Sequence, residues 1–295
     1  MDFIKTKSLL SQMLDCCENQ KSKIKNQKLT GFVPTMGALH RGHISLVEQC
    51  RKENDVTVVS IFVNPTQFNN TEDLANYPRT IDEDLEKLAS AGCDIVFAPA
   101  VAEMYPEEDK RIFDFGTLDK VMEGKHRPGH FNGVAQVVSR LFDIVKPDKA
   151  YFGEKDFQQL AIIRELVRQL DLKIRIAACP IVREKDGLAM SSRNRHLDEN
   201  QRKQAVVISK TLFESRKIRK NYSVTDLKQW VKDKINAASG LHVEYFEIID
   251  GFTLQPIDKW EDTDYSVGCV AVFSGDIRLI DNVSYLKNAY LCCNF

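Results

Sequence analysis

The sequence predicts an α/β fold in which a doubly wound parallel sheet is followed by a smaller α+β domain. Strand-like and helix-like patterns alternate along residues 1–185, which is typical of a parallel sheet with helical crossovers. The run 56–63 is almost continuous in β-forming residues, as expected for a strand buried on both faces. Because the pattern changes at Asp186-Gly187, we predict one domain of residues 1–185 and a second of residues 186–295.

The elements of the first domain follow from hydrophobic spacing. For example, Val134, Val138 and Leu141 recur at helical spacing and predict a helix that packs on the sheet. Thr80 and Glu83 form the pattern of a capping box that opens another helix. The expected strands are 28–33, 56–63, 94–99, 149–152 and 174–182, and the expected helices are 8–23, 44–53, 80–91, 134–145 and 157–170. Residues 103–117 look irregular, with one possible edge strand.

The second domain has a different pattern. Two helices are expected at 198–219 and 224–238, and residues 243–248 alternate between apolar and polar side chains as a half-buried strand does. Ser274-Gly275-Asp276 separates two further strand patterns, so it predicts a β-hairpin. Helices and antiparallel strands in separate runs indicate an α+β domain.

Composition excludes several classes of function. The chain has 41 basic and 42 acidic residues in 295, a net charge of −1, so we expect no nucleic-acid partner and no membrane surface. No signal peptide or transmembrane run is visible, and eight cysteines without a secretion signal indicate reduced thiols. These observations predict a cytoplasmic protein.

The most informative stretch is Pro34–His43, a strand-to-helix turn at the edge where open α/β sheets bind ligands. Gly37 and Gly42 allow the backbone to approach a ligand closely. His40 and His43 are three residues apart, so a helical turn places them on one face. The free N–H groups of a helix N-terminus attract phosphate, and the helix dipole favours neutral imidazoles that donate hydrogen bonds.

Other interpretations of this turn make different demands on its residues. The glycine spacing is that of a P-loop, but His43 and Ile44 stand where Lys and Ser or Thr are required, so a P-loop is excluded. Two histidines could bind zinc, but no third ligand has a recognised spacing. A buried structural pair of histidines remains an alternative.

Polar segments follow other predicted strands. Asn64 and Gln67 come after the strand 56–63, where the alternative is a plain Asn-Pro turn. Gly153–Asp156 forms a second strand–polar-turn–helix, and the basic loop 124–133 is either an anion clamp or a solvated loop. Lys155 and Arg193 add cations, and no nucleophile has an adjacent base. This set of groups suits stabilisation of charge on a polyphosphate.

The turn His40-Arg41-Gly42-His43 resembles the HxGH signature of adenylyl-transferring Rossmann enzymes. Further motifs extend the resemblance to the pantothenate synthetase family. They are Asn64-Pro65-Thr66-Gln67-Phe68, Tyr77-Pro78-Arg79-Thr80, Arg127-Pro128-Gly129-His130-Phe131, Gly153-Glu154-Lys155-Asp156-Phe157-Gln158-Gln159 and Met190-Ser191-Ser192-Arg193-Asn194. The resemblance implies a Rossmann-like sheet, with a C-terminal domain that acts as a lid.

The resemblance also implies an activity. ATP would adenylate the carboxylate of pantoate, and the amine of β-alanine would then displace AMP to give pantothenate, as in an amide ligase of coenzyme A biosynthesis. Magnesium is expected with ATP, and a homodimer is the usual assembly of the family. The alternative is a nucleotidyltransferase of the same superfamily that acts on a phosphate acceptor. A non-catalytic nucleotide-binding module is a further alternative, and the charge balance disfavours a tRNA-binding protein.

The residues implied by the matching motifs fall into four groups. The catalytic residues are His43, His40, Lys155 and Arg193. The ATP-binding residues are Met36, Gly37, Ala38, Leu39, His40, Arg41, Gly42, His43, Gly153, Glu154, Lys155, Asp156, Val182, Met190, Ser191, Ser192 and Arg193. The substrate-binding residues are Gln67, Gln159 and Asn64. The metal ligand is Asp84, in Glu83-Asp84-Leu85-Glu86-Lys87, which stands where the family can carry Asp-Asp-x-x-Gln.

Overall fold

The structure is a computed structural model, which describes residues 1–19 and 28–286. It divides into two compact units, and each is assembled from three segments of the chain. Unit 1 comprises Met1–Phe115, Arg127–Glu154 and Ile162–Pro180, and unit 2 comprises Gly116–His126, Lys155–Ala161 and Ile181–Phe295. No single position in the sequence therefore separates the two units. The division into two domains at residue 185 stays a prediction.

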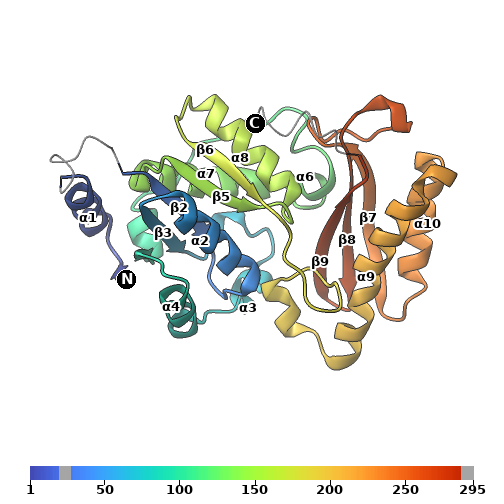
Figure 1. The fold of residues 1–295 in the computed structure, drawn as a ribbon, viewed down its shortest axis with the longest axis horizontal. Helices are drawn as coiled ribbons and strands as arrows, with labels where there is room; N and C mark the ends of the chain where they lie inside the picture. Colours follow the sequence, from blue (N-terminus) through green and yellow to red (C-terminus); the bar gives the residue numbers. More distant parts are fainter. Residues whose placement is uncertain (20–27, 287–295) are drawn as a thin grey trace. The chain divides into compact units, whose positions relative to one another are not determined.

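Unit 1 is built on a six-stranded parallel sheet with the order β1-β4-β3-β2-β5-β6 (Figure 1). Its strands are β1 (Asp2–Ile4), β2 (Thr30–Thr35), β3 (Val56–Ile61), β4 (Ile95–Phe97), β5 (Lys149–Gly153) and β6 (Arg175–Cys179). The direction of the strand order reverses between β2 and β5, which is how a doubly wound sheet is connected. The predicted fold class is confirmed.

Helices cover both faces of this sheet. On one face, Val33 of β2 and Val59 of β3 pack with Leu46 of α2 and Leu88 of α4. On the other face, the ring of Phe32 lies 6.4 Å from that of Phe142 in α7. The helices of the first 180 residues are α1 (Lys7–Asn19), α2 (Arg41–Glu53), α3 (Thr71–Asn76), α4 (Ile81–Ser90), α5 (Val101–Met104), α6 (Met122–His126), α7 (His130–Val145) and α8 (Phe157–Gln169), with the short 3-10 helix η1 (Pro65–Gln67).

Two local predictions were wrong. The edge strands of this sheet are β1, which pairs with β4, and β6, which pairs with β5, and no strand forms between residues 103 and 117, all of which the structure describes. Thr80 does precede α4 as its N-cap residue, but its hydroxyl accepts no capping hydrogen bond. It donates instead to the Asp84 carboxylate at 3.2 Å.

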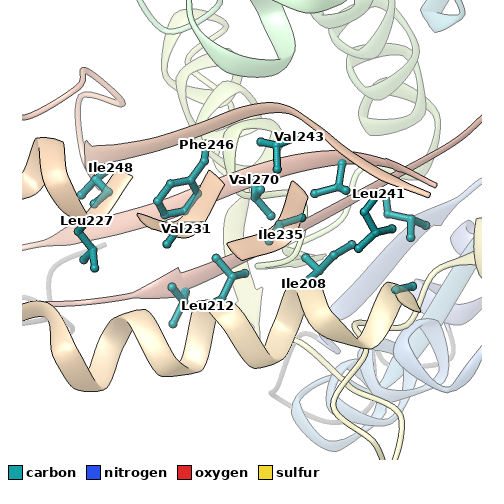
Figure 2. Close-up of a cluster of buried hydrophobic side chains, with 14 of the residues drawn as sticks. Ile208, Leu212, Leu227, Val231, Ile235, Leu241, Val243, Phe246, Ile248 and Val270 are labelled. Carbon is teal, nitrogen blue, oxygen red and sulfur yellow. The ribbon is translucent and has the colours of Figure 1, made fainter. Parts of the chain in front are cut away.

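Unit 2 contains a three-stranded antiparallel sheet in the order β7-β8-β9, formed by Leu241–Asp250, Ser266–Ser274 and Ile277–Ser284. Its helices are α9 (Glu199–Ile218) and α10 (Val224–Asn236), with 3-10 turns η2 (Ser192–His196), η3 (Arg219–Asn221) and η4 (Trp260–Asp262). Figure 2 shows Leu212 of α9, Val231 of α10 and Val270 of β8 within one apolar cluster. The predicted hairpin at Ser274–Asp276 is confirmed.

The opposite face of this sheet is covered by chain segments that come earlier in the sequence. Met122 of α6 packs in a cluster with Tyr245, Ile249 and Val267. The carboxylate of Glu123 receives two hydrogen bonds from Arg278, each of 2.8 Å, and one from the Tyr245 hydroxyl. Residues 116–126 thus belong to the core of unit 2. Within the described residues, no helix combines the length and apolar character needed to cross a membrane.

Candidate active site

The carboxyl ends of β3, β2 and β5 are neighbours in the sheet of unit 1. Thr35, the last residue of β2, is paired with Ile61, the last residue of β3. β5, which ends at Gly153, lies on the other side of β2. Parallel sheets bind ligands at this edge, at the point where the strand order reverses. The turn after β2 and the segments after β3 and β5 therefore occupy the expected position of a site.

The loop between β2 and α2 has an unusual backbone. Gly37 and Ala38 both have positive φ, 81° and 50°. A left-handed conformation costs a non-glycine residue roughly 1–2 kcal/mol, so the loop needs a compensating interaction. Asp84 supplies it, because its carboxylate accepts the N–H of Ala38 at 2.9 Å and the N–H of Leu39 at 2.7 Å. The Lys87 ammonium donates to the Leu39 carbonyl at 3.0 Å, so α4 holds both sides of this residue.

Two histidines form the cap of α2. His40 is the N-cap residue, and its Nδ1 accepts the N–H of Gly42 at 3.1 Å. His43 Nδ1 accepts the N–H of His40 at 3.3 Å, and the ring centroids are 4.1 Å apart. Backbone N–H groups only donate, so both Nδ1 atoms must be unprotonated in this arrangement. A neutral ring of this kind carries its proton on Nε2 and can donate it to an oxygen.

The predicted residues after β3 are largely buried. Asn64 is 0% exposed and Gln67 is 8% exposed. The Asn64 amide nitrogen donates to Gln67 Oε1 at 3.2 Å, and Gln67 Nε2 donates to the Met36 sulfur at 3.2 Å. The structure therefore brings together three residues that were predicted separately, from two neighbouring loops.

His130 supports Gln67 from α7. Its Nδ1 is 2.8 Å from the Gln67 carbonyl oxygen, and its Nε2 is 3.2 Å from an Arg127 guanidinium nitrogen. A carbonyl only accepts and a guanidinium only donates, so the ring is neutral with its proton on Nδ1. His130 was quoted within a sequence motif but was not predicted as a site residue. The signal in the sequence was its place in the motif Arg127-Pro128-Gly129-His130-Phe131, and its burial became apparent only in the structure.

The Arg41 side chain is occupied by an ion pair in this structure, and its role in ATP binding stays a prediction. Its guanidinium pairs with the Glu48 carboxylate on the surface of α2. Ala38 and Leu39 are almost fully buried, and their N–H groups bond to Asp84. Gly153 is the last residue of β5, and the N–H of Glu154, which follows it, donates to the carbonyl of Cys179 at the end of β6.

Unit 2 holds the predicted residues that follow Glu154. Lys155 and Gln159 are half-buried and Asp156 is exposed. The Lys155 carbonyl accepts the Asn282 amide of β9 at 3.1 Å. Gln158, which sequence reasoning did not assign, is buried and donates to the carbonyls of Leu118 and Val121 at 2.7 and 2.9 Å. It therefore fixes the start of α8 against the segment before α6.

The segment from Val182 to Arg193 is also in unit 2. The Met190 N–H donates to the Val182 carbonyl at 3.0 Å, and Arg183 forms an isolated bridge with Ala189. Gly187, with φ of 98°, closes the turn between them. Ser191 caps η2 by accepting the Arg193 N–H at 3.3 Å. The predicted ATP-binding residues of this segment therefore sit on and after a small hairpin.

Asp84 does not fit the role of magnesium ligand. It is 1% exposed, and both its oxygens accept backbone N–H groups of the loop after β2. The ammonium of Lys87, which stands where the family can carry a neutral amide, donates to the same loop. Within residues 1–19 and 28–286, no group of three or more His, Cys, Asp or Glu side chains could hold a metal ion. Magnesium that arrives with ATP needs only one or two protein carboxylates beside the phosphate oxygens, so its protein ligands stay a prediction.

Known proteins resemble this chain over almost its whole length. A family model described as Pantoate-beta-alanine ligase matches residues 4–284. Pantothenate synthetase of Bacteroides thetaiotaomicron is 59% identical over 258 residues, 88% of this chain and 92% of that protein. That of Phocaeicola vulgatus is 56% identical over 286 residues, 97% of this chain and 99% of that protein.

Solved structures give the same result. The crystal structure of pantothenate synthetase from Thermus thermophilus has a TM-score of 0.88 and 41% identity, and covers 97% of this chain and 100% of that one. Pantoate-beta-alanine ligase from Francisella tularensis, crystallised with beta-gamma ATP and beta-alanine, has a TM-score of 0.80 and 36% identity, with coverage of 98% and 99%. The chain belongs to the pantoate–β-alanine ligase family.

Proposed function

We propose that this chain, an ATP-dependent pantoate–β-alanine ligase, forms the amide in two steps through a pantoyl adenylate. In the first step a pantoate carboxylate oxygen attacks the α-phosphorus of ATP and pyrophosphate leaves. In the second, the β-alanine amine attacks the activated carbonyl carbon, AMP leaves and the amine loses a proton. The carboxylate must first be activated as an adenylate, because a free carboxylate is a poor acyl donor.

The observation that carries this proposal is the capping arrangement of His40 and His43. Both rings present Nε2 as a donor at the N-terminus of α2, where backbone N–H groups and the helix dipole favour a phosphate. Donors fixed in advance stabilise charge that develops on a leaving group. We therefore assign His40 and His43 to the pyrophosphate that departs in the first step.

Other roles follow from the family resemblance. Lys155 and Arg193 contact phosphate oxygens, and Gly153 and Asp156 bind the ribose. Val182 lies against adenine. Gln67 and Gln159 bind pantoate, and Gln67 is also near β-alanine. Magnesium would enter with ATP, and the phosphate oxygens would supply most of its ligands.

Isotope exchange tests the two-step reaction. Labelled pyrophosphate should exchange into ATP when pantoate is present and β-alanine is absent, because the first step is then reversible by itself. A nucleotidyltransferase would need its nucleotidylated phosphate product for exchange and would ignore pantoate. No exchange at saturating pantoate, in folded protein that binds ATP, would show that the stepwise mechanism is wrong.

The resemblance supports a homodimer, in a cytoplasmic enzyme. Sedimentation equilibrium between micromolar and nanomolar concentrations checks the assembly. A single species with the mass of the 33.7-kDa chain at every concentration would contradict the dimer.

A further inference from the structure

We propose that Tyr105 is a positioning residue for substrate recognition, because its hydroxyl holds the amide of Asn64, which in turn determines which end of the Gln67 amide faces the substrate. This inference rests on the proposed role of Gln67 as a pantoate-binding residue. Tyr105 lies in the turn after α5, outside every motif that carried the family resemblance.

A backbone carbonyl determines which end of the Asn64 amide faces the Tyr105 hydroxyl that holds it. The carbonyl oxygen of Gly133 in α7 lies 3.1 Å from the Asn64 amide nitrogen. A carbonyl can only accept, so the nitrogen must be the atom on that side. The amide oxygen then faces the hydroxyls of Tyr105, at 2.8 Å, and of Thr66, at 3.2 Å. Every hydrogen-bonding position of this fully buried amide is thereby used.

The orientation of Gln67 follows from that of Asn64. The second hydrogen on the Asn64 nitrogen points to Gln67, so the atom that receives it must be Oε1. Gln67 Nε2 is consequently turned away from Asn64, toward the Met36 sulfur. A thioether is a weak acceptor. The Gln67 N–H can therefore exchange its hydrogen bond to sulfur for one to a substrate oxygen at little cost. The pair thus selects a ligand that offers an oxygen acceptor, such as a hydroxyl or a carboxylate.

The surroundings hold Tyr105 and Gln67 rigidly. The Arg140 guanidinium carbon lies 5.1 Å from the centre of the Tyr105 ring, and Arg140 is itself bound to Asp109 at 2.7 Å. A Cβ atom on Gly133 would lie 2.3 Å from the Thr66 carbonyl oxygen, so only glycine lets α7 approach η1 this closely. Two connected amides between fixed neighbours are pre-organised, which is what a selective site requires.

The test compares Tyr105→Phe with Tyr151→Phe in the pantoate-dependent exchange assay. Tyr151 is a control in the same unit, since its hydroxyl accepts a hydrogen bond from Asn54 at 2.6 Å and donates one to Glu53 at 2.8 Å, and neither partner is a predicted site residue. Loss of one hydrogen bond corresponds to a change of about two- to tenfold. We expect Tyr105→Phe to raise KM for pantoate by that factor and to leave KM for ATP unchanged. We also expect its preference for pantoate over a dehydroxylated analogue, measured as the ratio of kcat/KM values, to be smaller. We expect Tyr151→Phe to change neither.

Two results would overturn the proposal. One is a KM for pantoate that is the same in Tyr105→Phe and Tyr151→Phe. The other is a KM for ATP that rises in Tyr105→Phe by the same factor as its KM for pantoate. A Gln67→Ala variant separates this failure from failure of the proposed role of Gln67, and the two-step reaction is tested independently by the exchange itself. If Gln67→Ala leaves KM for pantoate unchanged while exchange persists, Gln67 does not bind pantoate, and the roles of Gln67 and Tyr105 both fall. If Gln67→Ala raises KM and Tyr105→Phe does not, only the role of Tyr105 is wrong. In the Gln67→Ala background, Tyr105→Phe should have no further effect on KM for pantoate.

Discussion

His40 and His43 fix one another at the start of α2, since His43 Nδ1 accepts the His40 N–H while His40 Nδ1 accepts that of Gly42. The two side chains are therefore both structural and, in our proposal, catalytic. Substitutions that keep only one of these roles can separate them. At position 43, the third residue of α2, the amide oxygen of an asparagine is as many bonds from Cβ as Nδ1 is and can accept the same His40 N–H, whereas asparagine is too short to replace the Nε2 donor.

We predict that His43→Ala lowers the single-turnover rate of adenylation by roughly 10²–10⁴. His43→Asn should keep the stability of the wild type yet be as slow as His43→Ala, because it retains only the cap. Supplied pantoyl adenylate should still react with β-alanine in both variants. Adenylation near the wild-type rate in a folded His43→Ala protein would exclude a role for His43 in the first step.

For Asp84 we predict a loss of stability and no change in magnesium dependence. Asp84→Asn replaces one acceptor of the two loop N–H groups with a donor, so the free energy of unfolding should fall by about 1–3 kcal/mol. The magnesium concentration that gives half-maximal activity should be unchanged. The control is Glu83→Gln, which breaks an exposed pair with Lys87 on the same helix and should cost little. A normally stable Asp84→Asn protein with a raised magnesium requirement would show that Asp84 is a metal ligand after all.

The segment 187–194 is predicted to gain protection from hydrogen exchange when ATP and pantoate bind. Its small residues surround one cation, Arg193, which phosphate oxygens would fix in place. Amide exchange measured by mass spectrometry, with and without both ligands, checks this. The amides of β8, which lie within a sheet, provide the reference for full protection. High and equal protection of 187–194 in both states would indicate a rigid loop.

Asp109 should make stability depend on pH at the acid end. Its hydrogen bond with Arg111 and its contact with Arg140 hold the pKa of this carboxyl well below its usual range. A carboxyl whose pKa is lower in the folded state stabilises the fold above its unfolded pKa, near about 4. This contribution disappears as pH falls toward the folded value.

The measurement is urea unfolding of Asp109→Asn and the wild type between pH 7 and pH 3. The difference in unfolding free energy should be constant from pH 7 to pH 5 and should shrink below about pH 4. The matched control is Asp171→Asn, whose carboxylate pairs with Lys173 in full exposure to solvent, and it should show almost no difference at any pH. A difference for Asp109→Asn that does not change down to pH 3 would contradict the assignment.

Sequence reasoning predicted the strands of the sheet because their evidence is local. β3 is nearly continuous in β-forming residues, and the turn before α2 lies where its glycines and histidines indicate. The strand β1 was missed because Asp2-Phe3-Ile4 contains no continuous run of β-forming residues like the one in β4, and it is defined only by its pairing with β4.

The supports of the site could not be predicted in the same way. Tyr105 contacts Asn64 across 41 positions of sequence, and Asp84 reaches Ala38 across 46. Neither contact leaves a trace in hydrophobic periodicity or in a short motif. Asp84 was predicted as a metal ligand because Glu83-Asp84-Leu85-Glu86-Lys87 stands where the family can carry Asp-Asp-x-x-Gln. Only the folded arrangement reveals that its partner is the backbone of another loop.

Unit 2 is assembled from three segments of the chain, and this affects how the protein can be engineered. A gene fragment that encodes only the C-terminal part would leave Tyr245, Ile249 and Val267 without Met122, so an apolar sheet face would be open to solvent and to self-association. Arg278 would also lose Glu123, and a largely buried guanidinium would be left without that carboxylate. A split enzyme, a circular permutant or a chimaera with a transplanted C-terminal part must therefore carry residues 116–126 and 155–161 along with it.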